Sequence, residues 1–106
     1  MTDSRLEQLK KMLETEPNDS FLNYALALEH ARVNEITEAI RLIEEIIARD
    51  ANYLGAYYQL GKYYELSSNP AKAIEIYKKG IELAKQQKNR KTQLELNEAL
   101  LQLEDD

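Results

Sequence analysis

Apolar side chains recur at helical spacing along almost the whole of this chain. The first apolar stripe repeats at intervals of three and four residues and consists of Leu6, Leu9, Met12 and Leu13. This spacing places the four side chains on one face of a helix, so the sequence predicts an amphipathic helix over residues 4–15. Pro17 ends that helix because proline has no backbone N–H to donate.

Two more helices are predicted in the first half of the chain. The first covers residues 20–33, where Asp19 or Ser20 can accept a hydrogen bond from a backbone N–H and so cap the helix. Asn34 can adopt the left-handed conformation that ends a helix. The second covers residues 35–49 and carries one apolar stripe with charged residues outside it. That stripe consists of Ile36, Ala39, Ile40, Ile43, Ile46 and Ile47.

Three helices are predicted in the second half, over residues 53–66, 70–87 and 91–103. Asn69 followed by Pro70 is a start signal, because the asparagine can cap a helix and the proline needs no N–H at its first position. The connections are short, so consecutive helices should pack antiparallel.

The last of these helices is rich in leucine. Its leucines are Leu94, Leu96, Leu100, Leu101 and Leu103. We expect Leu94, Leu101 and Leu103 to cover the open end of the preceding helix pair. The three acidic residues 104–106 are expected to form a frayed tail.

The apolar pattern occurs twice at a fixed period, so that residues 18–51 align with residues 52–85 position by position. The matching pairs include Asn18 with Asn52, Tyr24 with Tyr58, Leu26 with Leu60, Ala39 with Ala73, Ile40 with Ile74 and Ile47 with Ile81. A fixed period of roughly 20 to 50 residues is typical of stacked repeats. One helix pair cannot bury its own apolar face, so the two units should stack on each other.

The second copy of the repeat carries a characteristic residue set. It consists of Tyr57, Leu60, Gly61 and Tyr64 in the first helix, and Ala73, Tyr77 and Gly80 in the second. This set resembles the pattern of the tetratricopeptide repeat family, as found in small bacterial proteins. The first copy keeps Ala39 but has Leu26-Ala27 for Leu-Gly, His30 for the tyrosine and Asn23 for the first aromatic residue.

The resemblance implies an all-α superhelix of antiparallel helix pairs. Residues 1–106 would form a single domain of six helices. Its parts would be an N-terminal half-unit helix at 4–15, full units at 20–53 and 54–87, and a capping helix at 91–103. Ala27 and Gly61 have little or no side chain, which should let the paired helix approach closely, with Ala39 and Ala73 facing them.

Composition limits the function of the chain. It has 106 residues, enough for one continuous core. The formal net charge of −5 disfavours nucleic acid as a partner. The absence of cysteine excludes disulfides, thiolate metal sites and a cysteine nucleophile. No secretory signal and no long apolar run is found, which predicts a cytoplasmic protein without membrane contact.

Catalysis is not predicted. His30 is the only histidine, and it lies at a core-type position where a packed or half-buried side chain is expected. The three glycines are isolated, so no phosphate-binding loop is present. The acidic residues fall on outer helical faces beside lysine and arginine, which is typical of solvated helix surface. We therefore predict no enzyme activity, no catalytic residue, no metal site and no cofactor.

The tyrosines suggest a binding surface. Tyr57, Tyr64 and Tyr77 fall on packing positions, whereas Tyr24 and Tyr58 occupy equivalent positions that the resemblance places on the inner, concave face. A core role for these two remains the alternative. Tyrosine suits recognition because it is amphipathic and loses little side-chain entropy. The candidate groove consists of Phe21, Tyr24, Leu28, Tyr58, Lys62 and Glu65.

We therefore predict a protein–protein interaction module, or scaffold, that binds an apolar peptide or helix of a protein partner in this groove. Some family members clamp a chaperone's terminal carboxylate with Lys and Asn. The corresponding positions here are Tyr24 and Leu28, so that role is not implied. The alternative is self-association, for instance as a homodimer, in which a second copy covers Leu96 and Leu100.

Overall fold

The computed structural model describes residues 3–104, and over that range the chain folds into six helices. They are α1 (Asp3–Thr15), α2 (Ser20–Arg32), α3 (Ile36–Arg49), α4 (Gly55–Leu66), α5 (Pro70–Gln86) and α6 (Arg90–Glu104). The predicted all-α class is confirmed, and every predicted helix boundary lies within two residues of the observed one. Glu104, expected in a frayed tail, is part of α6, and residues 105–106 lie outside the described range.

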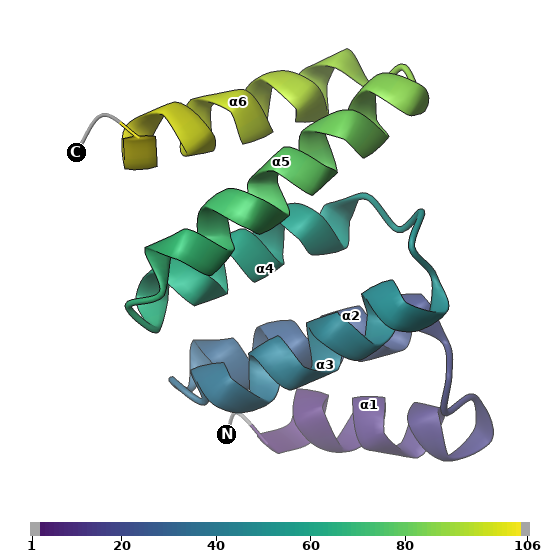
Figure 1. Cartoon of the computed structure of the whole chain (residues 1–106). Coiled ribbons are helices and arrows are strands. Elements are labelled where there is room, and N and C mark those ends of the chain that lie inside the picture. Colours follow the sequence, from purple (N-terminus) through teal and green to yellow (C-terminus); the bar gives the residue numbers. More distant parts are fainter. Residues whose placement is uncertain (1–2, 105–106) are drawn as a thin grey trace.

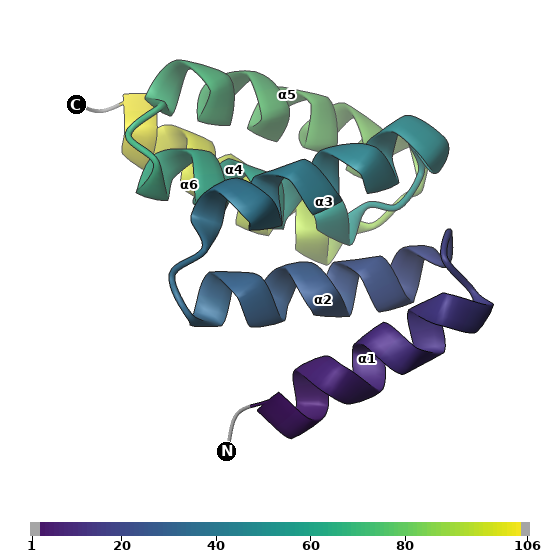
Figure 2. The ribbon, with the colours of Figure 1, turned by 90° about the horizontal axis from the view of Figure 1, so that it is seen from below.

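Consecutive helices run antiparallel and stack in chain order, with α1 at one end of the stack and α6 at the other (Figure 1). The α3 and α5 helices form one face, and α2 and α4 lie behind them, as the view from below confirms (Figure 2). One continuous core runs between these two layers, from Leu26 in α2 to Ala99 in α6. The α2–α4 layer and the α3–α5 layer therefore present two separate surfaces.

The two turns inside the helix pairs have the same backbone geometry. Asn34 and Ser68, which occupy equivalent positions of the two units, both have a positive φ, of 68° and 61°. The next residue in each turn donates its N–H back into the helix, from Glu35 to His30 O and from Asn69 to Tyr64 O, at 2.8 Å in both. This is the usual closure of a helix by a left-handed residue.

Polar side chains start the helices as predicted. Asp19 accepts a hydrogen bond from the N–H of Leu22 at 2.8 Å and caps α2. Asn69 accepts one from the N–H of Lys72 at 3.3 Å and caps α5, with Pro70 at the first helical position. These bonds satisfy N–H groups that would otherwise lack a partner at the helix start.

Asn23, which replaces the first aromatic residue of the unit, makes the same hydrogen bond as its equivalent Tyr57. The Asn23 amide donates to the carbonyl of Pro17 at 3.0 Å, and the Tyr57 hydroxyl donates to the carbonyl of Ala51 at 2.7 Å. Both acceptors lie six residues earlier in the chain, so they too occupy equivalent positions of the repeat. The polar substitution is therefore buried without leaving an unpaired group.

The α4 and α5 helices pack closely at Gly61. A Cβ atom on Gly61 would overlap the ring of Tyr77, so only glycine fits against that ring. In the first unit the equivalent residues are Ala27 and Ile43, and both are fully buried. Isoleucine is smaller than the tyrosine at the equivalent position, and alanine is larger than the glycine. The two units therefore distribute the volume of their cores differently between the paired helices.

The predicted role of the leucines in α6 is partly wrong. Leu94 and Leu101 are 54% and 59% exposed, while Leu96 is fully buried against Gly80. Leu103 is partly buried on the core, as expected. The predicted self-association surface is also wrong, because it relied on Leu96 and on Leu100, which packs against the core.

The cause of this error is a change of register after the second unit. The α3 helix ends at Arg49, whose equivalent is Leu83, but α5 continues to Gln86. The α5–α6 turn then has the geometry of a turn inside a pair, with Lys88 at φ 57° and Asn89 N bonded to Ala84 O at 2.9 Å. The repeat period therefore no longer indicates which side of α6 faces the core.

The close contact at Gly61 leads to a stability prediction. In an exposed helix Gly→Ala is stabilising by about 1 kcal/mol, but at Gly61 the methyl group would overlap the Tyr77 ring. Overpacking of this kind costs roughly 1–3 kcal/mol. We expect Gly61→Ala to lower the free energy of unfolding, measured by urea denaturation.

Two variants control this measurement. Gly55→Ala should not destabilise the fold, because its Cβ would lie at an ordinary contact distance of 3.8 Å from the nearest atom, the Tyr24 hydroxyl oxygen. The double variant G61A/Y77I reproduces the Ala–Ile pair of the first unit, so it should be more stable than the two single effects added together. Equal effects of G61A and G55A would contradict the proposed steric cause.

Candidate functional site

Tyr24 lies at the junction between the two repeat units. Its ring centroid is 5.6 Å from that of Tyr53, which belongs to the turn between α3 and α4, and the two rings are tilted by 46°. Burial raises the pKa of the Tyr24 hydroxyl, and a hydrogen bond with the side chain of Gln59 partly offsets this. The half-buried ring is therefore held by the turn that ends the first unit and by Gln59 of the second unit.

Tyr58, the equivalent of Tyr24, belongs to a different cluster on α4 and α5. Its ring centroid is 6.4 Å from that of Tyr77, and the ammonium of Lys62 lies 5.4 Å from the Tyr58 ring centroid. Lys62 also pairs with Glu65 at 3.9 Å, and Glu65 accepts a hydrogen bond from the Tyr77 hydroxyl. This network connects a fully buried ring, Tyr77, with a half-buried one, Tyr58.

The six residues of the predicted groove therefore fall into separate environments. Tyr58, Lys62 and Glu65 contact one another as described above, and Leu28 packs against the core. Phe21 is 65% exposed and lies beside α1, in a hollow that it shares with Met12. The predicted core positions of Tyr57, Tyr64 and Tyr77 are confirmed, and the His30 side chain is half-buried as expected.

Sequence reasoning missed two contacts of this face. The apolar pattern places Tyr53 only at a helix start and Tyr77 only in the core, although both rings contact the tyrosines of the candidate groove. The one signal for these contacts in the sequence is the aromatic residue Tyr53 in the turn before Leu54. Its partner cannot be inferred, because Tyr53 and Tyr24 are distant in the chain and only the folded turn after α3 brings them together.

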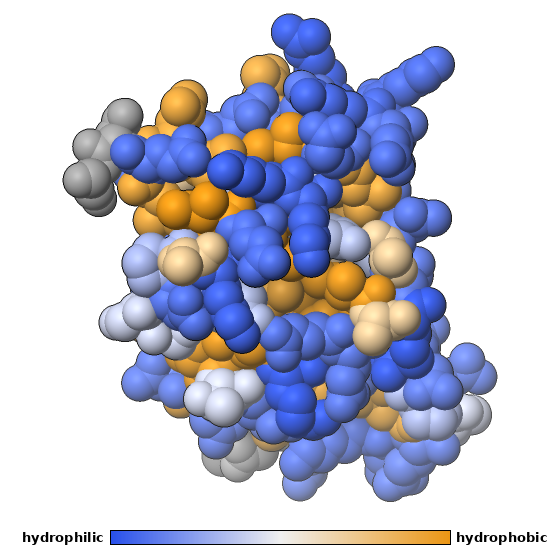
Figure 3. Space-filling view, in the orientation of Figure 1, coloured by the Kyte–Doolittle hydropathy of each residue, from blue (hydrophilic) through white to orange (hydrophobic). Residues whose placement is uncertain are grey.

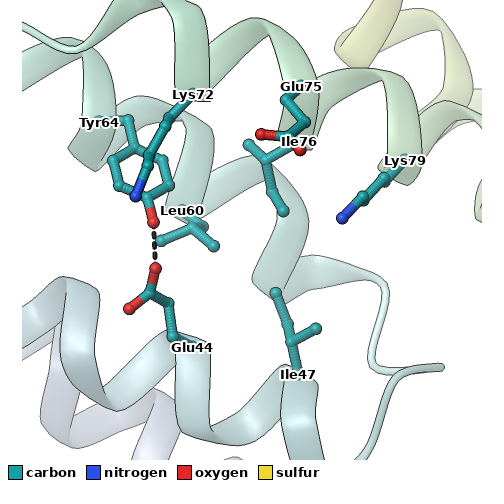
Figure 4. A pocket seen from close by; sticks show the side chains of 8 residues that line it. All are labelled: Glu44, Ile47, Leu60, Tyr64, Lys72, Glu75, Ile76 and Lys79. Atoms are coloured by element: carbon teal, nitrogen blue, oxygen red, sulfur yellow. Dashed lines mark hydrogen bonds between the residues drawn. The ribbon is translucent and has the colours of Figure 1, made fainter.

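A pocket of about 290 Å³ lies on the opposite face, between α3, α4 and α5 (Figure 4). Its lining residues are Glu44, Ile47, Leu60, Tyr64, Lys72, Glu75, Ile76 and Lys79. The space-filling view shows an apolar hollow with hydrophilic side chains around it on this face (Figure 3). No motif in the sequence singles out these residues as a group.

The polar end of this pocket is organised by Tyr64. Its hydroxyl donates a hydrogen bond to the Glu44 carboxylate, and the ammonium of Lys72 lies 5.6 Å from the ring centroid (Figure 4). The pKa of Tyr64 is raised to about 12, mainly by burial and secondly by the hydrogen bond to Glu44. Burial also raises the pKa of Tyr63 to about 12. These hydroxyls are therefore protonated and neutral at neutral pH.

Two negative findings apply to residues 3–104. No group of three or more histidine, cysteine, aspartate or glutamate side chains there is arranged to hold a metal ion. No helix in the described part of the chain is long and apolar enough to cross a membrane.

Comparison with known proteins identifies clear relatives, although no protein-family model matches the chain. The solution structure of a tetratricopeptide repeat domain protein from Salinibacter ruber is 40% identical, with a TM-score of 0.80. The match covers 84% of this chain and 90% of that one.

A TPR repeat-containing protein of Methanocaldococcus jannaschii is 34% identical over 76 residues, which is 72% of this chain. The matched part is only 24% of that protein, so the chain spans about a quarter of this relative's length. The TPR2B domain of yeast Sti1, in complex with pHsp70, has the same fold, with a TM-score of 0.89 at 17% identity. That match covers 98% of this chain and 83% of the yeast one.

The raised tyrosine pKa values predict alkaline destabilisation. A tyrosine with an ordinary pKa of 10.0 ionises in the unfolded chain, while Tyr63 and Tyr64 in the folded chain ionise only near pH 12. Between these values the folded state binds more protons, so the free energy of unfolding must fall as the pH rises. Urea denaturation from pH 9 to pH 12 should show this fall.

A variant at Glu44 isolates one contribution. Glu44→Gln keeps a hydrogen-bond acceptor but removes the negative charge, so the pKa of Tyr64 should move toward 10.0 without reaching it, because burial remains. Tyrosinate absorbance would measure this change. A Tyr64 pKa that is the same in both proteins would show that the Glu44 charge has no influence.

Proposed function

The chain belongs to the tetratricopeptide repeat family, and we propose that it is a protein-interaction module that binds an apolar peptide or helix across its α2–α4 face. Members of this family are generally interaction modules rather than enzymes. The observation that carries the proposal is the pair of half-buried tyrosines, Tyr24 and Tyr58, at equivalent positions of the two units. Each is fixed by a second tyrosine ring from another element.

Preorganised aromatic rings make effective anchors for a partner. Tyr24 is held by Tyr53, and Tyr58 is held by Tyr77 and Lys62, so little side-chain freedom remains to be lost on binding. Rings of this kind offer apolar area together with a hydroxyl for hydrogen bonding. This supports a ligand with apolar side chains, contacted by both tyrosines.

The charges on this face support the same ligand class. Lys62 and Glu65 form an ion pair with each other, so the rim beside Tyr58 has no net charge from these two side chains. A mixed rim of this kind gives register and selectivity rather than strong attraction to one sign of charge. Leu28 and Tyr24 extend the apolar part of the face along α2.

The fold supports a peptide ligand without identifying it. The Sti1 domain, which has the same fold, is in complex with pHsp70. The identity is too low to transfer that ligand, and Tyr24 and Leu28 stand where carboxylate-clamping family members have Lys and Asn. Three further parts of the proposal remain predictions from the sequence: a single domain over residues 1–106, units at 20–53 and 54–87, and a cytoplasmic location.

Selection from a displayed library of short peptides would test the proposal, with affinities measured by fluorescence anisotropy. We expect the selected peptides to be rich in apolar residues. The double variant Y24A/Y58A should weaken their binding at least tenfold, because it removes both anchors. Y24F/Y58F keeps the rings and should retain most of the affinity.

The control variant E75A/K79A changes two side chains on the pocket of the opposite face and leaves the net charge unchanged. It should bind the selected peptides like the unmodified protein. Circular dichroism must show that Y24A/Y58A remains helical. Peptides that bind Y24A/Y58A as well as the unmodified protein, or that are displaced by changes at Glu75 and Lys79 instead, would refute the proposal.

A further inference from the structure

Apolar side chains are exposed at both ends of the helix stack. Apart from Phe21, which the sequence also assigned to the candidate groove, they lie outside the surface of the proposed function. In the described residues, α1 packs mainly on α2, and α6 packs mainly on α5, whereas α3, α4 and α5 each have major contacts with two helices. Each end helix therefore has one side without a helix neighbour. The large apolar residues most exposed at the two ends are Met12, Phe21, Leu94 and Leu101.

At the first end, α1 and α2 enclose a slot of about 220 Å³. Its apolar part is formed by Leu9, Met12, Phe21, Leu22 and Ala25. Met12 and Phe21 are 52% and 65% exposed, so their side chains form accessible walls of the slot. Arg5 and Gln8 line the polar end, and the Arg5 side chain is 69% exposed although it pairs with Glu29 at 3.1 Å.

At the other end, α6 presents a narrow apolar ridge. Leu94 and Leu101 are seven residues apart, so they lie on the same side of the helix, two turns from each other. Glu98 lies between them, one turn from each, and is exposed. The buried side of the helix, with Leu96 and Ala99, points the opposite way. The ridge is therefore free to contact another molecule.

The slot and the ridge have complementary shapes, and each has a charged side chain of opposite sign. One is a hollow between two helices, and the other is a single helix with two projecting leucines. The acidic Glu98 on the ridge is opposite in charge to Arg5 at the slot, whose exposed side chain can contact a second carboxylate besides Glu29. Because α1 and α6 lie at opposite ends of the stack (Figure 1), the ridge cannot reach the slot of its own chain.

We propose that the Leu94–Leu101 ridge of one copy docks into the α1–α2 slot of a second copy of this chain. The contact joins two different surfaces, so it is heterologous rather than two-fold symmetric. Each added copy still offers one slot and one ridge, which leads to head-to-tail chains or, where the rotation closes, to rings. The stack of helices then continues from one molecule into the next, and the four exposed apolar side chains are covered.

Light scattering coupled to size exclusion tests this proposal in the 106-residue chain. The weight-average mass should rise with concentration over roughly 10 µM to 1 mM, the range expected for an interface of small area. M12S/F21S disables the slot and L94S/L101S disables the ridge. All four side chains are exposed, so both variants should keep their helical circular dichroism. If L94S/L101S does not, the single variant Leu101→Ser replaces it.

Each disabled variant alone should remain a monomer over the same range. An equimolar mixture of the two should form a 1:1 dimer and nothing larger, because only one intact slot and one intact ridge remain to pair. The control V33S/L66S removes two other exposed apolar side chains, at the C-terminal ends of α2 and α4, and should assemble like the unmodified chain.

Four results would overturn the proposal. They are a monomeric unmodified chain at all concentrations, assembly of either disabled variant alone, a mixture that stays monomeric, and a control that loses assembly as fully as the end variants. Assembly lost in only one of the two end variants would indicate a two-fold symmetric dimer through the other variant's changed surface.

Discussion

The contact between Gly61 and the Tyr77 ring determines both the spacing of one helix pair and the surface next to it. Because glycine lets α4 approach α5, the Tyr77 ring is buried completely beneath α4. The Tyr77 ring then lies beside that of Tyr58, and its hydroxyl donates a hydrogen bond to Glu65, which in turn pairs with Lys62. A packing requirement inside the pair thus fixes the side chains that face outward from α4. Core and candidate binding face are one connected network in the second unit.

The first unit satisfies the same requirements with different residues. Ala27 and Ile43 replace the glycine and the tyrosine, so the pair is still closely packed, but no hydroxyl extends to the outer face. Asn23 makes the hydrogen bond to the preceding turn that the Tyr57 hydroxyl makes in the second unit. The two units therefore share a set of contacts more than a set of residue types. Consequently Tyr24 depends on a ring from the inter-unit turn, whereas Tyr58 depends on a ring from its own pair.

The sequence was sufficient to predict features that depend on local spacing. Helix boundaries follow from apolar periodicity and from caps such as Asp19 and Asn69, which act within one turn of their position. The orientation of α6 could not be predicted, because it depends on how far α5 continues past Leu83, and leucines occur on both sides of α6. The partners of Tyr24 and Tyr58 were also out of reach. Tyr53 and Tyr77 meet them only after turns and helices are assembled in space.

The exposure of an apolar side chain in such a stack depends on its neighbouring unit as much as on its own helix. Phe21 and Tyr24 are one turn apart on α2, yet Phe21 is 65% exposed while Tyr24 is half-buried. The difference arises because Tyr24 is covered by the turn that follows α3, whereas Phe21 lies in the hollow beside α1, where Met12 is itself partly exposed. A finite stack always ends in helices with one uncovered side, and polar residues normally occupy it. Here leucine, methionine and phenylalanine remain on those sides, so the ends of this stack differ in kind from its tyrosine-bearing face.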